Sequence, residues 1–218
     1  FTIPATTPNA GTYSASVTFT PTDLTSYKTV VGSVDVTVAK ANQAALTVTG
    51  LPASAVYQQA GITAGTSGGS GTGAVTYSAG ASTACSVDSS TGAVTITSGT
   101  GSCSITATKA ADTNYNEATS APILITITPK PITVTADPGQ TKVYGEADPI
   151  PYTYTSSEEI EFTGSLSRLA GEDAGAYAIT QGDLSAGPNY TIIIAPVDFS
   201  ITPKPITVTA DPGQTKVY

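Results

Sequence analysis

The chain has 218 residues, of which only 11 % are charged, and its formal net charge is −8 with no histidine. Nucleic-acid binding requires clustered lysine and arginine, so this acidic composition argues against that function, and a histidine-dependent catalytic triad is excluded. No stretch approaches the run of about 18 apolar residues that spans a membrane, and neither membrane contact nor a cofactor is expected for this segment.

Residues 1–40 are predicted to be the C-terminal part of an Ig-like β module. Residues 13–19 alternate apolar side chains with serine or threonine, and residues 34–38 carry valine at every second position, which is the pattern of half-buried strands. Asn9-Ala10-Gly11 supplies a turn before the first run. Two or three strands bury too little surface to fold alone, so the remaining strands of this module are expected outside the segment.

Residues 41–128 are predicted to form a complete Ig-like β-sandwich. Short strands separated by Gly- and Ser-rich turns are typical of that fold. The candidate strands are residues 46–49, 61–63, 74–78, 84–87, 93–97, 102–108 and 123–127. Ser16–Thr20 aligns without gaps on Ser104–Thr108 at an offset of 88 residues, so the first module repeats the end of the second.

Cys85 and Cys103 are the two cysteines of the chain. Without histidine or a CxxC motif a metal or redox site is disfavoured, and a disulfide is predicted, which implies an oxidising compartment. In a flat meander the two cysteines would lie two strands apart, about 9–10 Å, whereas a disulfide needs Cα atoms within roughly 7 Å. The bridge therefore predicts that the cysteine strands face each other across the sandwich, or that the meander breaks.

The sequence ITPKPITVTADPGQTKVY occurs twice, at residues 127–144 and 201–218. Such self-similarity marks a tandem array. Residues 129–203 are predicted to be one β module and residues 204–218 to contain the first strand of another. Proline fixes φ and removes a backbone donor, so both Pro-Lys-Pro segments are predicted to be stiff linkers that cannot join a central β ladder. The linker residues are Pro129, Lys130, Pro131, Pro203, Lys204 and Pro205.

Residues 129–203 resemble the MBG domain of YGX type, a small β module of large bacterial surface proteins. The matching motifs are Lys130-Pro131-Ile132-Thr133-Val134, Lys142-Val143-Tyr144-Gly145-Glu146, Asp148-Pro149, Ala174-Gly175-Ala176-Tyr177, Asn189-Tyr190, and Phe199 with Ile201. Residues 41–128 look like bacterial Ig-like repeats. The resemblance implies an adhesin-like array, secreted or on the bacterial cell surface, without catalytic residues. The overall expectation is an all-β chain of tandem Ig-like sandwiches in an elongated array, and not an enzyme.

Three features have a structural and a functional interpretation. Glu158, Glu159 and Glu161 are either weak calcium candidates, since calcium prefers oxygen ligands, or a solvated strand face. Lys142 and Asn189 are conceivable partners in an isopeptide bond of the kind found in some bacterial surface domains, although nothing in the sequence places them together. A set of tyrosines either packs in the cores or lines a sugar-binding face: Tyr13, Tyr27, Tyr77, Tyr115, Tyr144, Tyr177 and Tyr190.

Three functions therefore stay open. The first is a structural stalk or spacer whose partners are neighbouring repeats of the same chain. The second is an adhesive module that binds host or matrix glycans. The third is a filament of copies of the chain, formed by strand addition, for which Ile206 and Val208 are the candidate residues.

Overall fold

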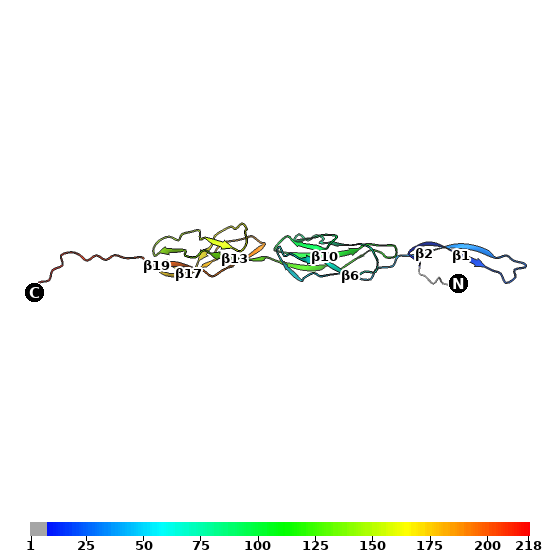
Figure 1. Cartoon of the computed structure of the whole chain (residues 1–218), viewed down its shortest axis with the longest axis horizontal. Coiled ribbons are helices and arrows are strands. Elements are labelled where there is room, and N and C mark those ends of the chain that lie inside the picture. The colour runs from blue at the N-terminus through cyan, green and yellow to red at the C-terminus, as the bar shows by residue number, and fades with distance from the viewer. Residues whose placement is uncertain (1–7) are drawn as a thin grey trace. The chain divides into compact units, whose positions relative to one another are not determined.

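The computed structural model describes residues 8–218, which contain 19 strands. No helix occurs in this described part, and hence no helix that could cross a membrane. The chain divides into two compact units, which meet between Thr128 and Pro129 (Figure 1). Residues 1–7 of the predicted first module lie outside the described residues.

Unit 1 begins with a two-stranded antiparallel hairpin. Strand β1 (Gly11–Phe19) pairs with β2 (Val30–Val38) along its full length. The Tyr13 hydroxyl donates a hydrogen bond of 2.7 Å to the Asn9 carbonyl, which fastens the turn that precedes β1. Within the described residues the hairpin has no third strand, so its apolar side chains stay exposed.

The rest of unit 1 is a β-sandwich in which three sheets share one core. One sheet has the order β11-β10-β12-β4 with β7 also paired to β10, the second has the order β5-β9-β8, and the third is β3-β6. The strands are β3 (Leu46–Thr49), β4 (Ser54–Val56), β5 (Ile62–Thr63), β6 (Gly65–Gly68), β7 (Val75–Ser78), β8 (Cys85–Val87), β9 (Ala93–Ile96), β10 (Ser102–Lys109), β11 (Ala118–Thr119) and β12 (Ile123–Thr128). All seven strands predicted for residues 41–128 have a counterpart here. The sequence pattern missed β4, β6 and β11, which are short or rich in glycine.

Cys85 and Cys103 form a disulfide with a Cα–Cα distance of 5.6 Å. Cys85 lies on β8, which pairs with β9, whereas Cys103 lies on β10 in another sheet. The meander therefore breaks after β9, as the distance argument required, and the bridge ties two sheets together inside the core.

Unit 2 contains two sheets, with the orders β15-β13-β18 and β14-β19-β17-β16. Its core includes Val134, Tyr152, Leu184, Phe199 and Ile201. The strands are β13 (Lys130–Ala136), β14 (Thr141–Val143), β15 (Tyr154–Ser156), β16 (Ser167–Arg168), β17 (Gly175–Thr180), β18 (Tyr190–Ile194) and β19 (Asp198–Thr202). The chain turns between β13 and β14 at Asp137-Pro138-Gly139, where Gly139 has a φ of 80° that favours glycine.

The last strand of each module is held in the same way. In unit 1, β4 pairs in parallel with β12 over three residues. In unit 2, β14 pairs in parallel with β19, also over three residues. In each module the first strand, β3 or β13, therefore belongs to one sheet and the next strand, β4 or β14, to another. This next strand holds the last strand of the module.

An Asn-Tyr pair holds the start of each module. The carbonyl of Asn114 accepts a hydrogen bond of 2.8 Å from the Ala41 amide, and that of Asn189 accepts one of 2.9 Å from the Lys130 amide. The side chain of Asn114 also accepts from the Ala10 amide at 2.8 Å. Asn114 therefore connects the sandwich to the turn that precedes β1.

The expectation that Pro129-Lys130-Pro131 is a linker that cannot join a central β ladder is wrong for Lys130 and Pro131. Lys130 and Pro131 belong to β13, the central strand of its sheet, and pair with β18. On the other side β13 pairs with β15 only from Val134 onward, so Pro131 lies where β13 has one neighbour and a missing donor is tolerated. Pro129 is thus the single residue between β12 and β13.

Residues 203–218 form no strand. Pro203, Lys204 and Pro205 follow the end of β19 directly. Ile206 and Val208, the strand-addition candidates, are each 86 % exposed.

Candidate functional site

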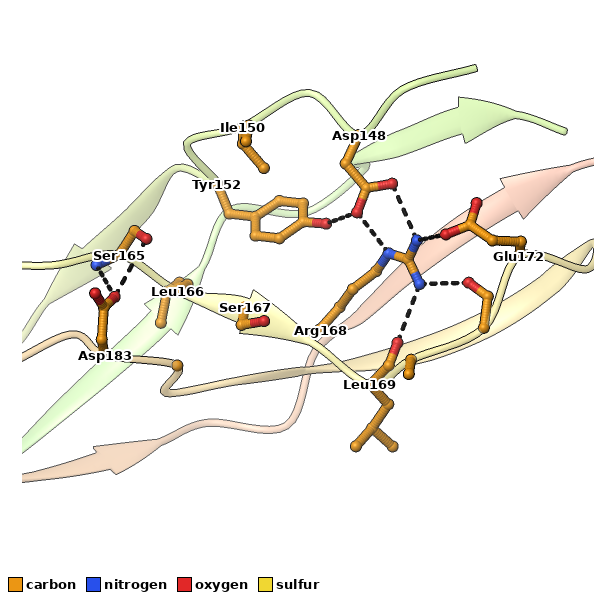
Figure 2. A pocket seen from close by; sticks show the side chains of 13 residues that line it. Asp148, Ile150, Tyr152, Ser165, Leu166, Ser167, Arg168, Leu169, Glu172 and Asp183 are labelled. Carbon is orange, nitrogen blue, oxygen red and sulfur yellow. Dashed lines mark hydrogen bonds and ion pairs between the residues drawn. The ribbon is translucent and has the colours of Figure 1, made fainter. Parts of the chain in front are cut away.

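The densest set of polar contacts in unit 2 joins two cations and two anions from four parts of the module. Lys142 lies on β14 and Arg168 on β16, whereas Asp148 and Glu172 lie in the loops that follow these strands. We call Lys142, Asp148, Arg168 and Glu172 the ionic cluster. It borders a groove of about 710 Å³ (Figure 2).

Arg168 is the centre of the ionic cluster. Its Nε donates to Asp148 Oδ2 at 2.7 Å, and its Nη2 donates to Asp148 Oδ1 at 3.0 Å and to Glu172 Oε1 at 2.7 Å. Its Nη1 donates to the carbonyls of Leu169 at 3.0 Å and Gly171 at 2.6 Å. A guanidinium has five N–H donors, so all of them are used, as Figure 2 shows.

The Arg168 guanidinium also lies against two aromatic rings. Its central carbon is 5.1 Å from the Tyr177 ring centroid and 5.3 Å from that of Phe199. Both distances are within the range of cation–π attraction. The ring of Tyr177 is fixed because its hydroxyl donates to the Asp173 carbonyl at 2.8 Å. Arg168 therefore joins the ionic cluster to the module core.

Lys142 supplies the second cation. Its ammonium lies 2.8 Å from Asp148 Oδ1 and also pairs with Glu172, and its side chain is only 4 % exposed. The hydrogen bonds to Asp148 and to Glu172 raise the pKa of Lys142. Burial of a lone lysine would have the opposite effect, so the two carboxylates keep this amine charged.

The pKa values of both carboxylates in the ionic cluster are lowered, as neighbouring cations require. The hydrogen bonds from Arg168, followed by those from Lys142 and Tyr152, hold the pKa of Asp148 well below its usual value, although burial opposes them. Lys142 and Arg168 also lower the pKa of Glu172. Tyr152 donates to Asp148 Oδ2 at 2.6 Å, and its burial, together with that carboxylate, raises its pKa to about 12.

These contacts determine what the ionic cluster can do. Two positive and two negative charges cancel, and the donors of Arg168 are saturated, so the groove presents no free cation to an anionic ligand. Tyr152 is kept protonated and is hydrogen-bonded to a carboxylate. Such a network holds loops against strands. Through its ion pairs, strand β14 is connected to the loop that follows it, to strand β16 and to the loop between β16 and β17.

The acidic residues singled out from the sequence lie elsewhere in unit 2. Glu158 forms an ion pair of 2.7 Å with Lys130, and both side chains are about one-third exposed. Residues 157–162 form no strand, so the interpretation of Glu158, Glu159 and Glu161 as a strand face is wrong. Among the described residues there is no group of three or more acidic, cysteine or histidine side chains that could hold a metal ion.

The conceivable isopeptide partners are held by other groups. Lys142 points to Asp148 and Glu172. Asn189 contributes its carbonyl to the Lys130 amide. The structure therefore brings Lys142 to two acids.

The tyrosines divide between the two interpretations. Tyr77 and Tyr177 pack against the cores of their modules. Tyr27 and Tyr144 are 65 % and 49 % exposed. The most deeply buried tyrosine is Tyr152, at 3 % exposure, which the sequence pattern did not single out.

Sequence reasoning missed the ionic cluster as a unit. Its members are spread over residues 142–172, and Asp148 was noted only as part of the Asp148-Pro149 motif. One signal was available, because Arg168 is the sole arginine of a chain with few charges. An isolated arginine near an apolar alternation is a candidate for a buried ion pair.

Together, the β-sandwich units, the repeated joint and the disulfide define an extracellular, repeat-type module. Residues 132–200 match the family model described as the MBG domain (YGX type), so unit 2 contains an MBG domain, as the sequence resemblance indicated. No curated protein sequence matches the chain. Among solved structures, the crystal structure of Drosophila N-cadherin EC1-4 is similar with a TM-score of 0.31 and 10 % sequence identity, over 88 % of this chain and 58 % of that chain. So low a similarity supports no inference about function.

Proposed function

We propose that this chain is a structural stalk or spacer segment of a large, repetitive, adhesin-like protein of the bacterial cell surface. The proposal is supported by the MBG domain in unit 2 and by the joint sequence that recurs after 74 residues. It is also supported by the ionic cluster, whose charges cancel and whose contacts are internal to the module.

The observation that carries the proposal is the pair of parallel clamps at the module ends. A pull on the chain enters a module through its first strand and leaves through its last strand. Because β4 runs parallel to β12, and β14 parallel to β19, such a pull slides the paired strands along each other. The hydrogen bonds of a parallel pair are evenly spaced along the strands, so this pull loads them together rather than one after another. A spacer under tension needs this arrangement.

The ionic cluster strengthens the clamp of unit 2. Lys142 lies within β14, where it pairs in register with Ile201 of β19. Its ammonium is held by Asp148 and Glu172. Sliding of β14 against β19 therefore requires the buried lysine to leave both carboxylates.

Single-molecule stretching of the chain between its two ends tests the proposal. We expect separate unfolding events for the two units. Tyr144→Pro, which removes the hydrogen bond of 2.8 Å that the Tyr144 amide donates to the Thr202 carbonyl at the end of this parallel pair, is expected to lower the unfolding force of unit 2. The control is Ile193→Thr, which changes a side chain that is 52 % exposed on β18 and should leave the force unchanged. If unit 2 of the unaltered chain yields without a resolvable force peak, the spacer proposal fails.

A glycan-binding role is the second candidate, and one observation favours it. Phe19, Tyr27 and Val30 line an open, mostly apolar groove at the tip of the hairpin. Aromatic rings at a surface suit the apolar faces of sugars. A glycan array with Tyr27→Ala as the matched variant tests it. Binding that is lost in the variant would support an adhesive module.

A further inference from the structure

Strand β14 is followed by a tight turn that contains the motif Tyr144-Gly145-Glu146. The Glu146 amide donates a hydrogen bond of 3.0 Å to the Val143 carbonyl, and Glu146 Oε2 accepts one of 3.3 Å from the Val143 amide. The Tyr144 amide donates to the Thr202 carbonyl at 2.8 Å. This bond lies one residue beyond the pairing of β14 with β19, which ends at Val143. The turn therefore lengthens the parallel pair by one hydrogen bond.

Strand β4 of unit 1 is followed by the same turn, built from a different sequence. The Gln59 amide donates to the Val56 carbonyl at 2.9 Å, and Gln59 Oε1 accepts from the Val56 amide at 2.9 Å. The Tyr57 amide donates to the Thr128 carbonyl at 3.0 Å, again one residue beyond the strand pairing. Gln58 takes the glycine position, and among the described residues it is the one non-glycine residue with a positive φ, of 62°.

The match between the two modules extends from the turn into the paired strands. In both modules an amide of the last strand donates to the carbonyl four residues before the tyrosine, and a threonine hydroxyl of the last strand donates to the carbonyl two residues before it. These bonds run from Thr126 to Ala53 at 3.0 Å, from Ser200 to Gln140 at 3.2 Å, from Thr128 to Ala55 at 3.4 Å and from Thr202 to Lys142 at 3.2 Å. The two turns therefore occupy the same place in the same topology.

The side chain behind the turn differs between the modules. The middle residue of β4 is Ala55, which is 2 % exposed, and the middle residue of β14 is Lys142, which is 6 % exposed. Ala55 makes no ion pair, whereas Lys142 pairs with Asp148 and Glu172. Because the turn is the same with alanine or lysine behind it, the turn is not a consequence of the ionic cluster.

The strands before these turns need an additional support. In the described part of the chain β4 and β14 each stand at the end of a sheet, and each pairs with the last strand over three residues. A short edge strand with few contacts is prone to local opening. The turn opposes opening in two ways, because it adds a hydrogen bond to the last strand and because the side chain of Gln59 or Glu146 binds the amide of the last strand residue.

We propose that the two turns are latches that keep β4 and β14 paired with the last strands of their modules. Residues 57–59 are then the YGX motif of unit 1, with glutamine in place of glycine. The latches act on the module without load, and their benefit under tension rests on the spacer function proposed above.

The two latches differ in backbone strain. Gly145 has a φ of 85°, in the left-handed region that favours glycine, whereas Gln58 adopts that region with a side chain. A Cβ atom added at Gly145 would meet no atom within 4 Å, so a substitution there changes the backbone preference without a clash. Exchange of the two residues should therefore loosen the latch of unit 2 and tighten that of unit 1.

Hydrogen exchange of the full chain, followed by mass spectrometry, tests the latches without any pull. Gly145→Gln should lower the protection of residues 141–144 by at least about fivefold, which corresponds to the smallest usual cost of a non-glycine residue in the left-handed region. Gln58→Gly should raise the protection of residues 54–57 by about twofold or more, since the freedom of glycine in the open state offsets part of the gain. The control is Gly187→Gln. Gly187 has a φ of 76° and open space around it but lies in the loop before β18, so residues 141–144 should not change relative to the rest of unit 2.

The side-chain contact of the latch is tested by a second pair of variants. Glu146→Ala should speed the exchange of the Val143 amide by roughly two- to tenfold, which is the effect of losing one hydrogen bond. Glu146→Gln should keep the protection, because Gln59 makes the same contact in unit 1. Equal exchange in these two variants would overturn the role of the side chain.

The latch proposal as a whole is overturned if Gly145→Gln and Gln58→Gly change protection in the same direction, or if either leaves its own strand unchanged. It is also overturned if Gly187→Gln loosens residues 141–144 as much as Gly145→Gln does. Absence of a force peak in the stretching experiment, with the expected exchange results, would reject the spacer function and leave the latches in place.

Discussion

Reduction of the Cys85–Cys103 disulfide should destabilise the sandwich of unit 1 and leave unit 2 unchanged. The bridge closes a loop over a sequence separation of 18 residues. The chain-entropy relation gives about 3 kcal/mol for a loop of that length. Cys103 is 0 % and Cys85 6 % exposed, and the reduced thiols remain small apolar groups in place, so reduction adds no cavity term. For a domain of this size such a loss lowers the Tm by roughly 10–25 °C.

Hydrogen exchange followed by mass spectrometry, with and without reductant, measures the effect module by module. Peptides from residues 41–128 should lose protection equivalent to about 3 kcal/mol. Peptides from residues 130–202 contain no cysteine and serve as the internal reference. A Cys85→Ala, Cys103→Ala variant should be insensitive to reductant. A loss below about 1 kcal/mol, or an equal loss in both units, would refute the loop-entropy reasoning.

Four further predictions concern the ionic cluster and the disulfide. Arg168→Met should cost unit 2 about 3 kcal/mol or more, because Asp148, whose side chain is 23 % exposed, loses its two-point guanidinium partner and keeps only Lys142 and Tyr152. Lys130→Met, which removes the exposed pair with Glu158, should cost less than about 1 kcal/mol in urea unfolding. The folded-state pKa of Asp148 is depressed from 3.8. The stability that its ionised carboxylate contributes to unit 2 is therefore complete above that pH and is lost as the pH falls further. A pH titration of unit 2 unfolding should therefore show an acid-side decline that Asp148→Asn removes. The pKa of Tyr152 is raised from 10.0 to about 12. The contribution of Tyr152 to the stability of unit 2 is therefore complete below pH 10.0 and declines between pH 10.0 and about 12. Tyr152→Phe should remove this alkaline decline, whereas Tyr27→Phe should retain it. In single-molecule stretching, reductant should lengthen the unit 1 event by roughly 55 Å, which is the extended length of the released loop less the Cα–Cα distance of 5.6 Å, and should leave the unit 2 event unaltered.

Much of the fold could be predicted because alternation and turn chemistry act locally. The valines of residues 34–38 and the Asp-Pro-Gly turn at residues 137–139 are recognisable without any tertiary information. The short strands β4 and β11 leave little room for alternation and were missed. Pro131 was misjudged for a different reason, since whether a strand position has one neighbour or two depends on the partner strands and not on the sequence around the proline.

The ionic cluster could not be predicted because its members meet only after folding. Glu158, Glu159 and Glu161 drew attention as neighbours in the sequence, yet Glu158 reaches Lys130 at the surface. Asp148 has no charged neighbour in the sequence beyond Glu146, but folding brings Lys142, Arg168 and Tyr152 to its two oxygens. Proximity in the sequence thus identified the exposed charges and not the buried ones.

The duplicated segment separates local from tertiary causes within one molecule. Residues 132–135 and 206–209 have the same sequence, hence the same intrinsic strand preference. The first copy is a buried central strand, with β18 on one side and β15 on the other, and the second forms no strand. Strand preference spans only about 1 kcal/mol and depends on context, which is too little to order an isolated segment. The pairing with β15 and β18 therefore determines the conformation of residues 132–135, and their sequence alone does not.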